Sequence, residues 1–350
     1  MSYLKHEKTF GYIYFMTEID LFGYPSGSYV KIGLVKGTEE GRSSIERRKE
    51  HQTGNPRKII VEKEIKTYAQ VSTLESLIHQ KLAKNRIHGE WFKYDQKGIA
   101  PYIEITEELK NYLESQIDAE NEIANYLSIE DNQQEIKASS ESKDIHKQLL
   151  KIKERILNLK KERELTVLKL KSFNKSFSKD IDGICSYEKV KPSQSFDRVA
   201  FQKDYPEIVD KIGIMVINHN FLIKKDLKQK KNDEIKDLEK IIKLQKFEEE
   251  NSKRTIERNK SSIELHKIWL DIHVALQPLE IKRKYLENKL KLLTGDNLGI
   301  KEVCTWKRRK IKQVKKSDLI NFDSELANKY MKIGKPTIKF KVNDYRPYTF

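Results

Sequence analysis

Hydrophobic and polar positions change their spacing along this chain, and the change divides it into regions. In the first quarter, aromatic and β-branched runs at residues 9–16, 29–35 and 58–68 predict three strands, the first two paired antiparallel. Other segments repeat apolar residues every three to four positions, which is typical of amphipathic helices. We therefore expect an α+β protein that begins with a small antiparallel sheet and flanking helices.

Two sequence patterns predict where the first helices begin. Ser43 with Glu46, and Ser72 with Glu75, have the spacing of a capping box. The expected buried side chains are Ile59, Val61 and Ile65 on one side of the third strand, and Leu74, Leu77, Ile78 and Leu82 on the second helix.

The remainder of the chain predicts long helices. Residues 101–127 form an expected acidic helix, and the polar residues 128–143 an expected linker. A long helix from about residue 145 has coiled-coil spacing. A second helical region is expected from about residue 221 to 293, where Pro278 should kink or interrupt it. An antiparallel helical hairpin is the simplest arrangement, and a homodimer through these helices is a further expectation.

A repeated strand-then-helix module follows each long helix. Cys185-Ser186-Tyr187-Glu188 begins one copy and Cys304-Thr305-Trp306-Lys307 the other. Asp197 and Phe201 then correspond to Asp318 and Phe322, with the same four-residue spacing. The expected domains are 1–97, a small α/β unit; 98–143, the acidic helix and linker; 144–213, a long helix and the first module; and 214–350, long helices and the basic second module.

Composition indicates an anionic partner. The 69 Lys and Arg against 53 Asp and Glu give a net charge of +16, which favours nucleic acid. The chain contains no run of 18 apolar residues, so no membrane span is expected. Only two cysteines in 350 residues suggest a reducing compartment, so we expect a cytoplasmic protein. We expect DNA as the partner, with RNA as an alternative, and no membrane.

Five short segments occur in a characteristic order. They are Tyr12-Ile13-Tyr14, Lys31-Ile32-Gly33, Arg47 with His51, Glu75 and Gly89-Glu90-Trp91-Phe92. Together they resemble the GIY-YIG endonuclease superfamily, and within it the phage and bacterial branch with Lys-Ile-Gly in the second motif. Residues 9–95 carry the resemblance. It implies a phage, mobile-element or anti-phage defence context.

The resemblance implies hydrolysis of phosphodiester bonds. Tyr14 would be the general base and Arg47 would bind the phosphoryl oxygens. Glu75 would hold Mg²⁺ or Mn²⁺. Lys31 would favour the ionised tyrosine, and His51 would contact phosphate or relay a proton.

Each of these residues also has an ordinary structural interpretation. Tyr12 could compete with Tyr14 for the role of base. Lys31 could be a solvent-exposed lysine of a strand, and a capping box would account for the presence of Glu75. For His79 and Glu90 the structural interpretation is favoured, and Trp91 and Phe92 are expected in the core. Two alternatives to a DNA endonuclease therefore stay open, namely an RNA nuclease and an inactive nucleic-acid-binding or assembly protein.

The densest basic segment lies near the C-terminus. Its residues suit phosphate contacts, and the expected nucleic-acid-binding set is Arg48, Lys307, Arg308, Arg309, Lys310 and Lys312. Trp306 is expected in the core. Residues 280–342 resemble the tail of YqaJ-type phage recombination exonucleases. The acidic residues 101–142 could mask these basic regions when no nucleic acid is bound.

Overall fold

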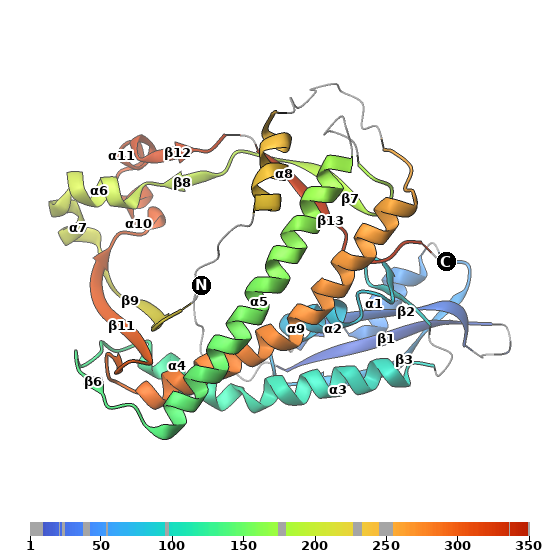
Figure 1. Cartoon of the computed structure of the whole chain (residues 1–350), viewed down its shortest axis with the longest axis horizontal. Helices are drawn as coiled ribbons and strands as arrows, with labels where there is room; N and C mark the ends of the chain where they lie inside the picture. The colour runs from blue at the N-terminus through green and yellow to red at the C-terminus, as the bar shows by residue number, and fades with distance from the viewer. Residues whose placement is uncertain are drawn as a thin grey trace.

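The chain combines an N-terminal sheet with two long helices and a duplicated C-terminal part (Figure 1). This computed structural model describes residues 10–20, 22, 25–37, 43–53, 55–94, 98–173, 180–226, 233–244, 255–335 and 337–348. The expected α+β class is confirmed. Among the described helices, none has both the length and the apolar character required to cross a lipid bilayer.

An antiparallel sheet with strands of different lengths forms the N-terminal part. Its strands are β1 (Gly11–Ile19), β2 (Pro25–Lys36), β3 (Lys58–Thr67), β4 (Arg86–His88) and β5 (Trp91–Lys93). Their order across the sheet is β3-β1-β2-β5-β4. The three strands expected from the sequence are present and β1 pairs antiparallel with β2, while Thr9 lies outside the described residues.

Helices cover both faces of this sheet. They are α1 (Ser44–Gln52) on one face and α2 (Val71–Lys81) and α3 (Ala100–Ser115) on the other. The capping box of Ser43 and Glu46 is present. The core under α2 and α3 contains Ile13 and Phe15, because side chains alternate along β1 and its odd positions face these helices.

The third strand does not keep its expected face. Ile59 and Val61 pack beside Tyr14, whereas Ile65 lies in the opposite core with Ile13. The cause is a β-bulge: Phe15 pairs with Lys63 and Met16 with Val61, so one extra residue of β3 is inserted. An extra residue reverses the alternation, and the expectation that all three side chains share one side is therefore wrong.

Two long helices pack against each other and against the sheet domain. They are α5 (Ser140–Phe173) and α9 (Lys260–Thr294), with α8 (Asp233–Leu244) beside α5. Leu149 near the start of α5 shares a core with Leu290 near the end of α9, so the pair is antiparallel as expected. On α9, Gln277 donates to the carbonyl of Leu77. Helix α2 therefore lies between the sheet and α9.

The structure departs from several expectations for this region. Pro278 lies inside a continuous α9, so it does not interrupt the helix. Residues 214–223 form strand β9 (Ile214–Ile223), so the second helical region does not begin at Phe221. The expected polar linker contains β6 (Glu135–Ile136), which pairs with β10 (Gly299–Ile300). The acidic helix is also divided, because α4 (Ile117–Tyr126) follows α3 after Gln116.

The two repeated modules interlock. The first contains β7 (Cys185–Val190), β8 (Gln194–Phe196), α6 (Arg198–Asp204), α7 (Pro206–Ile212) and β9. The second contains β11 (Cys304–Gln313), α10 (Lys316–Phe322), α11 (Ser324–Lys329), β12 (Met331–Ile333) and β13 (Thr337–Val342). Strands β7, β8 and β9 pair antiparallel with β13, β12 and β11 respectively. The first strand of each copy thus pairs with the last strand of the other.

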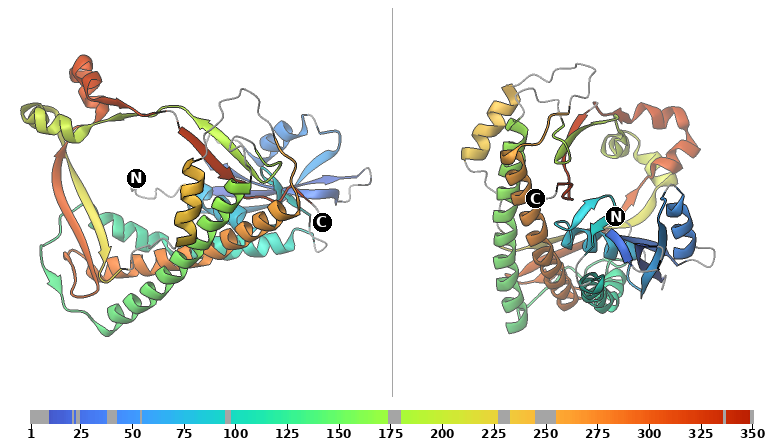
Figure 2. Two further views of the ribbon diagram at one scale, coloured as in Figure 1. Left: turned by 45° about the horizontal axis from the view of Figure 1, so that its top comes forward. Right: turned by 90° about the vertical axis from the view of Figure 1, so that its right-hand side faces the viewer.

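This pairing produces two ribbons joined by a helical tip (Figure 2). One ribbon, β9 with β11, leaves the helix pair near Leu149, and the other, β7 with β13, leaves it near Leu170. At 1.5 Å per residue these points are about 30 Å apart along α5. The four short helices of the tip share a separate core that contains Phe201, Val209 and Leu319.

The structure shifts the expected alignment of the two modules. Phe201 is buried four residues after Asp197, the N-cap of α6. The buried residue four positions after Lys315, the N-cap of α10, is Leu319, whereas Phe322 is 41% exposed. Leu319 and not Phe322 therefore corresponds to Phe201. Side-chain burial identifies the equivalent positions. Residue type alone matches Phe201 with a residue three positions too late in the second module.

Candidate active site

Tyr14 is buried on the α1 side of the sheet, and its hydroxyl lies against the backbone of β2. Tyr14 and Gly33 are paired residues of β1 and β2. A Cβ atom at Gly33 would be 2.4 Å from the Tyr14 hydroxyl oxygen. The glycine of the second motif therefore provides the space in which the tyrosine of the first motif lies.

Arg47 is the cation that acts on Tyr14. Burial raises the pKa of the Tyr14 phenol, the charge of Glu90 raises that pKa further, and the Arg47 guanidinium lowers it. The hydroxyl has no hydrogen bond of ordinary geometry within the described part of the chain. Arg47 itself is held by Glu50, with 2.6 Å between Nη1 and Oε2.

Lys31 interacts with a different partner from the one expected. Its Nζ donates to Glu90 Oε2 at 2.5 Å, and it lies 5.6 Å from the centre of the Trp91 ring. The Lys31 side chain is only 7% exposed. The expectation that Lys31 lowers the pKa of Tyr14 is therefore not met, because the Glu90 carboxylate neutralises this lysine and Arg47 takes that role.

Glu75 lies at the edge of the sheet where β5 ends. Strand β5 pairs with β2 at Tyr29, Val30 and Lys31, and the Ile32 N–H donates to the Glu90 carbonyl at 3.0 Å. Beyond Ile32, β2 has no described strand on that side and pairs with β1 alone. Helix α2 covers this edge. The N–H of Leu34 donates to the Glu75 carboxylate, and His79, one turn along the helix, donates from Nε2 to the carbonyl of Ile32 at 3.0 Å.

The capping box proposed for Glu75 is absent. The N-cap of α2 is Gln70, so Ser72 and Glu75 both lie inside the helix. The carboxylate is instead in an unfavourable environment, since burial first and the charge of Glu90 second raise the pKa of Glu75 to about 7. A partly buried carboxylate with a raised pKa is typical of functional sites, although ion-pair networks also produce such shifts.

The two histidines of the region have different environments. Burial first, and the cations Lys31 and Arg47 next, lower the pKa of His51. Its Nε2 is buried and accepts no hydrogen bond from the described residues. Neutral His51 can therefore accept a proton. His79 is fixed by the β2 edge and by the Phe92 ring, whose centroid is 5.2 Å away, which agrees with its structural interpretation.

The structure brings the five expected side chains into one electrostatic cluster. The pKa of Tyr14 responds to Arg47 and Glu75, that of Glu75 to Lys31, and that of His51 to Lys31 and Arg47. They come from β1, β2, α1 and α2, which are separate in sequence and adjacent in the fold.

Two members of the cluster were not expected from the sequence. Glu90 affects the pKa of Tyr14 and of Glu75, and it pairs with Lys31. Arg86 acts on Glu75 and donates from Nε to the carbonyl of Gly89. The signal for Glu90 was its place in the Gly89–Phe92 motif. Its role depends on a turn with Gly89 at φ +54°, which the motif alone did not reveal.

The cluster suits a hard divalent cation with few protein ligands. Within the described residues, no three His, Cys, Asp or Glu side chains gather as a metal site. The charge of Glu90 raises the pKa of Glu75, and both carboxylates raise the pKa of Tyr14. A cation beside Glu75 would offset this unfavourable charge. One or two carboxylates with water and phosphate are typical ligands of Mg²⁺.

The C-terminal basic segment is only partly available to a ligand. Arg308 is fully buried and donates to the carbonyls of Tyr126 at 3.3 Å and Asn297 at 3.2 Å. Its assignment to nucleic-acid binding is therefore wrong, because alternation along β11 points it inward with Trp306. Trp306 is buried as expected.

Other members of this segment are paired or exposed. Arg309 contacts Asp131 at 2.9 Å, and Lys312 contacts Asp210 at 3.1 Å. Lys307 and Lys310 are exposed, and neither side chain has an ion-pair partner among the described residues. Asp131 comes from the acidic region that was expected to mask basic residues, and its carboxylate also accepts from the Arg308 backbone at 2.7 Å.

Comparison with known proteins finds that the N-terminal part is similar to a nuclease-associated domain family. A model of the T5orf172 domain matches residues 11–115, from β1 to the end of α3. No curated protein and no solved structure matches the chain. The matched range contains the whole cluster around Tyr14 and Glu75. The resemblance of residues 280–342 to YqaJ-type exonucleases stays a prediction.

Proposed function

We propose that this protein is a metal-dependent endonuclease of the GIY-YIG type that hydrolyses phosphodiester bonds of DNA. The observation that carries the proposal is the convergence of Tyr14, Arg47 and Glu75 in one cluster, within a domain matched by a nuclease-associated family. The interaction of three groups from separate elements is more specific to phosphate chemistry than any one motif.

Each group has a distinct role in the proposed reaction. A water oxygen forms a bond to phosphorus while the bond to the leaving sugar oxygen breaks. The ionised phenolate of Tyr14 accepts the water proton, neutral His51 is a second acceptor in the same cluster, and the leaving sugar oxygen takes a proton from solvent. Arg47 binds the phosphoryl oxygens, on which negative charge increases in the transition state.

Glu75, with Glu90 beside it, would hold the divalent ion. Mg²⁺ or Mn²⁺ would supply charge neutralisation at the phosphate and acidify its own bound water. Binding of phosphate and cation also changes the environment of Lys31, which shares Glu90. The proposed role of Lys31 is therefore to hold Glu90 in place rather than to activate Tyr14.

The C-terminal ribbons are proposed to bind nucleic acid backbone. Lys307 and Lys310 are exposed on β11, and Lys189 and Lys339 are exposed on the second ribbon. Such contacts are independent of base sequence and weaken with salt. A homodimer through α5 and α9 stays a proposal, and a single active site would then cut one strand per subunit.

Cleavage of supercoiled plasmid with Mg²⁺ tests the proposal. We expect nicking by the wild-type protein and at least a hundredfold lower rate for Arg47→Ala and Glu75→Gln. Lys49→Ala, on the same helix as Arg47, and Glu104→Gln, an exposed carboxylate of α3, are matched controls that keep the wild-type rate. Equal rates in all five proteins would assign the nicking to a contaminant.

A specific observation favours the alternative of an inactive nucleic-acid-binding protein. Tyr14 has a raised pKa and Lys31 is neutralised by Glu90, so Tyr14 itself is not an activated base in the free protein. Binding of plasmid without nicking, across pH 6–9 and with Mg²⁺ or Mn²⁺, would support this alternative. A comparison of DNA with RNA of the same sequence at matched salt separates the two nuclease possibilities.

A further inference from the structure

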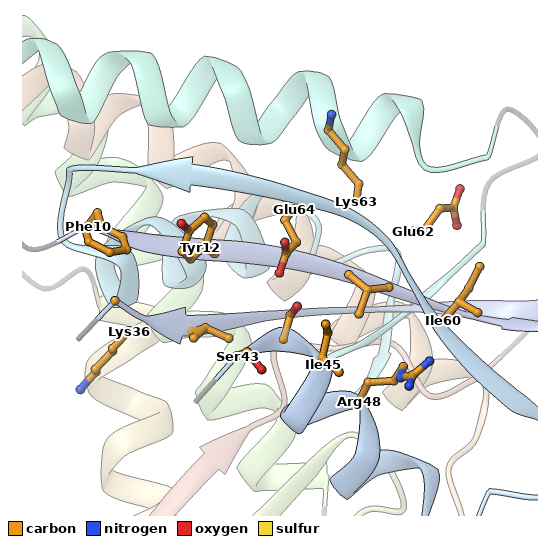
Figure 3. Close-up of a pocket in the computed structure, with 14 residues that line it drawn as sticks. Phe10, Tyr12, Lys36, Ser43, Ile45, Arg48, Ile60, Glu62, Lys63 and Glu64 are labelled. Atoms are coloured by element: carbon orange, nitrogen blue, oxygen red, sulfur yellow. The ribbon is translucent and has the colours of Figure 1, made fainter. Parts of the chain in front are cut away.

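A pocket of about 940 Å³ lies beside Tyr14 on the same face of the sheet. Figure 3 shows it between the sheet and α1. The side chains that give it its chemical character are Phe10, Tyr12, Lys36, Arg48 and Glu64. None of the roles assigned to Tyr14, Arg47 or Glu75 uses this pocket.

Aromatic rings line one part of the pocket. Tyr12 and Tyr14 are two residues apart on β1, so their side chains share a face about 7 Å apart along the strand. The Phe10 ring contacts Tyr12 edge-on, with 5.8 Å between centroids, and Phe10 is 36% exposed. Tyr12 occupies the position where the GIY-YIG pattern has glycine, so the aromatic wall is a feature of this chain.

Charged groups define the rest of the pocket. Arg48 follows Arg47 on α1, and Lys36 ends β2, so cations stand on two sides of the opening. Glu64 pairs with Tyr14 across the β1–β3 ladder, and Figure 3 shows it next to Tyr12. Its carboxylate makes no hydrogen bond or ion pair within the described ranges, and it is exposed. An aromatic face, a free carboxylate and flanking cations match a nucleotide with an amino group.

We propose that this pocket binds one unpaired nucleobase that carries an exocyclic amino group, from the nucleotide next to the phosphate at Tyr14. Tyr12 stacks on the base, and the Glu64 carboxylate accepts a hydrogen bond from the amino group, as carboxylates do from cytosine. Arg48 and Lys36 contact the flanking phosphates. The proposal rests on the proposed function, because it places the scissile phosphate at Tyr14.

The pocket predicts a preference that phosphate contacts cannot give. Thymine has no exocyclic amino group, and its one edge donor, N3–H, is flanked by the O2 and O4 carbonyl oxygens, so a thymine base would bring an acceptor oxygen close to the Glu64 carboxylate. Cytosine and adenine both supply the donor. The protein should therefore discriminate among single strands by base, even though most of its contacts are to backbone.

Binding of single-stranded homopolymers to the full-length Glu75→Gln protein tests the proposal without cleavage. We expect oligodeoxycytidine and oligodeoxyadenosine to bind more tightly than oligothymidine. Tyr12→Ala should weaken all three by about fivefold to a hundredfold, the range for one lost stack, whereas Tyr12→Phe should bind as the parent does. Glu64→Gln should remove the preference over oligothymidine. Tyr29→Ala, an exposed tyrosine of β2 outside the pocket, should have no effect.

The outcomes separate this inference from the proposed function. Unchanged binding by a folded Tyr12→Ala protein, or an unchanged base preference in Glu64→Gln, would overturn the inference even if plasmid is nicked. Base-selective binding that depends on Tyr12 and Glu64, together with no nicking by the wild type, would uphold the pocket and overturn the endonuclease. Equal affinity for all three homopolymers in the parent protein also overturns the inference.

Discussion

At the scale of single residues, the candidate site depends on two close environments that the sequence does not display. Gly33 leaves room for the Tyr14 hydroxyl, and the β2 edge holds Glu75 in a partly buried position. In each case one residue type is required because of a neighbour that is distant in the chain. Two substitutions examine these environments directly.

Gly33→Ala should destabilise the protein. The added methyl would meet the Tyr14 hydroxyl oxygen at 2.4 Å, and an overpacked core typically costs about 1–3 kcal/mol. The free energy of unfolding in urea measures the effect. The cost should be smaller in a Tyr14→Ala background, because the hydroxyl oxygen and the ring carbon Cζ, which the methyl would meet at 2.6 Å, are both absent. An equal cost in both backgrounds would contradict the proposed contact.

Glu75→Gln should change how stability depends on pH. The folded pKa of Glu75 is about 7, above its ordinary value, so ionisation is easier in the unfolded chain. Wild-type stability should therefore fall as pH rises through this window, and Glu75→Gln should remove the loss. Without Mg²⁺ we expect the variant to be more stable at pH 8 by on the order of 1 kcal/mol, after allowance for solvent screening, and equally stable at pH 4.

Thermal unfolding at the two pH values measures this difference, and Glu104→Gln is the control. Added Mg²⁺ should reduce the difference at pH 8, because a bound cation stabilises the ionised carboxylate in the folded protein. A variant that is less stable than the wild type at both pH values would show that the carboxylate is mainly structural.

At the scale of elements, β11 shows how a basic run is divided between core and surface. Alternation places Arg308 inside with Trp306, while Lys307 and Lys310 stay exposed. The Asp131 carboxylate, whose side chain is fully buried, accepts from the Arg308 backbone and contacts Arg309. The same strand therefore stabilises the ribbon and presents cations to solvent.

Replacement of both Lys307 and Lys310 by alanine should weaken nucleic-acid binding without unfolding the ribbon. Loss of two phosphate contacts should reduce the slope of log affinity against log salt by about 2. Fluorescence anisotropy over a salt series measures it. A double alanine variant of Lys137 and Lys143, exposed lysines near the acidic region, is the charge-matched control. An unchanged slope would remove these lysines from the binding surface.

At the scale of the whole molecule, the C-terminal segment returns to the candidate site. Asp344 contacts Arg86 at 2.9 Å, and the Arg346 backbone N–H donates to the Arg86 carbonyl at 2.6 Å. Arg86 in turn holds the turn that carries Gly89 and Glu90. The last residues of the duplicated region therefore support the geometry of the N-terminal cluster.

Asp344→Ala should lower the plasmid-nicking rate about threefold to tenfold, because Arg86 and the Gly89 turn lose a fixed partner. A partly exposed ion pair of this kind is worth about 1 kcal/mol. Asp344→Glu should restore most of the rate. Glu135→Ala is the control, since Glu135 makes a similar partly exposed pair with Lys224 at 2.6 Å, on strand β6 and outside the pocket that contains that turn. A rate loss of equal size in the control would indicate a general stability effect.

Local pattern determined much of this protein by itself. Alternation and capping signals predicted β1, β2 and α1, because these features depend on neighbours in the sequence. The order of five motifs also predicted Tyr14, Arg47 and Glu75 as members of one site. Their roles in catalysis stay predictions.

Only the tertiary structure decided which neighbours these residues have. The bulge in β3 moved Ile65 to the opposite core, the free edge of β2 replaced a capping box at Glu75, and Glu90 neutralised Lys31. The interlocking of β7–β9 with β11–β13 likewise joins residues that are 81 to 157 positions apart. Such pairings depend on which groups remain unsatisfied after local structure forms, and a single sequence does not contain that information in its local pattern.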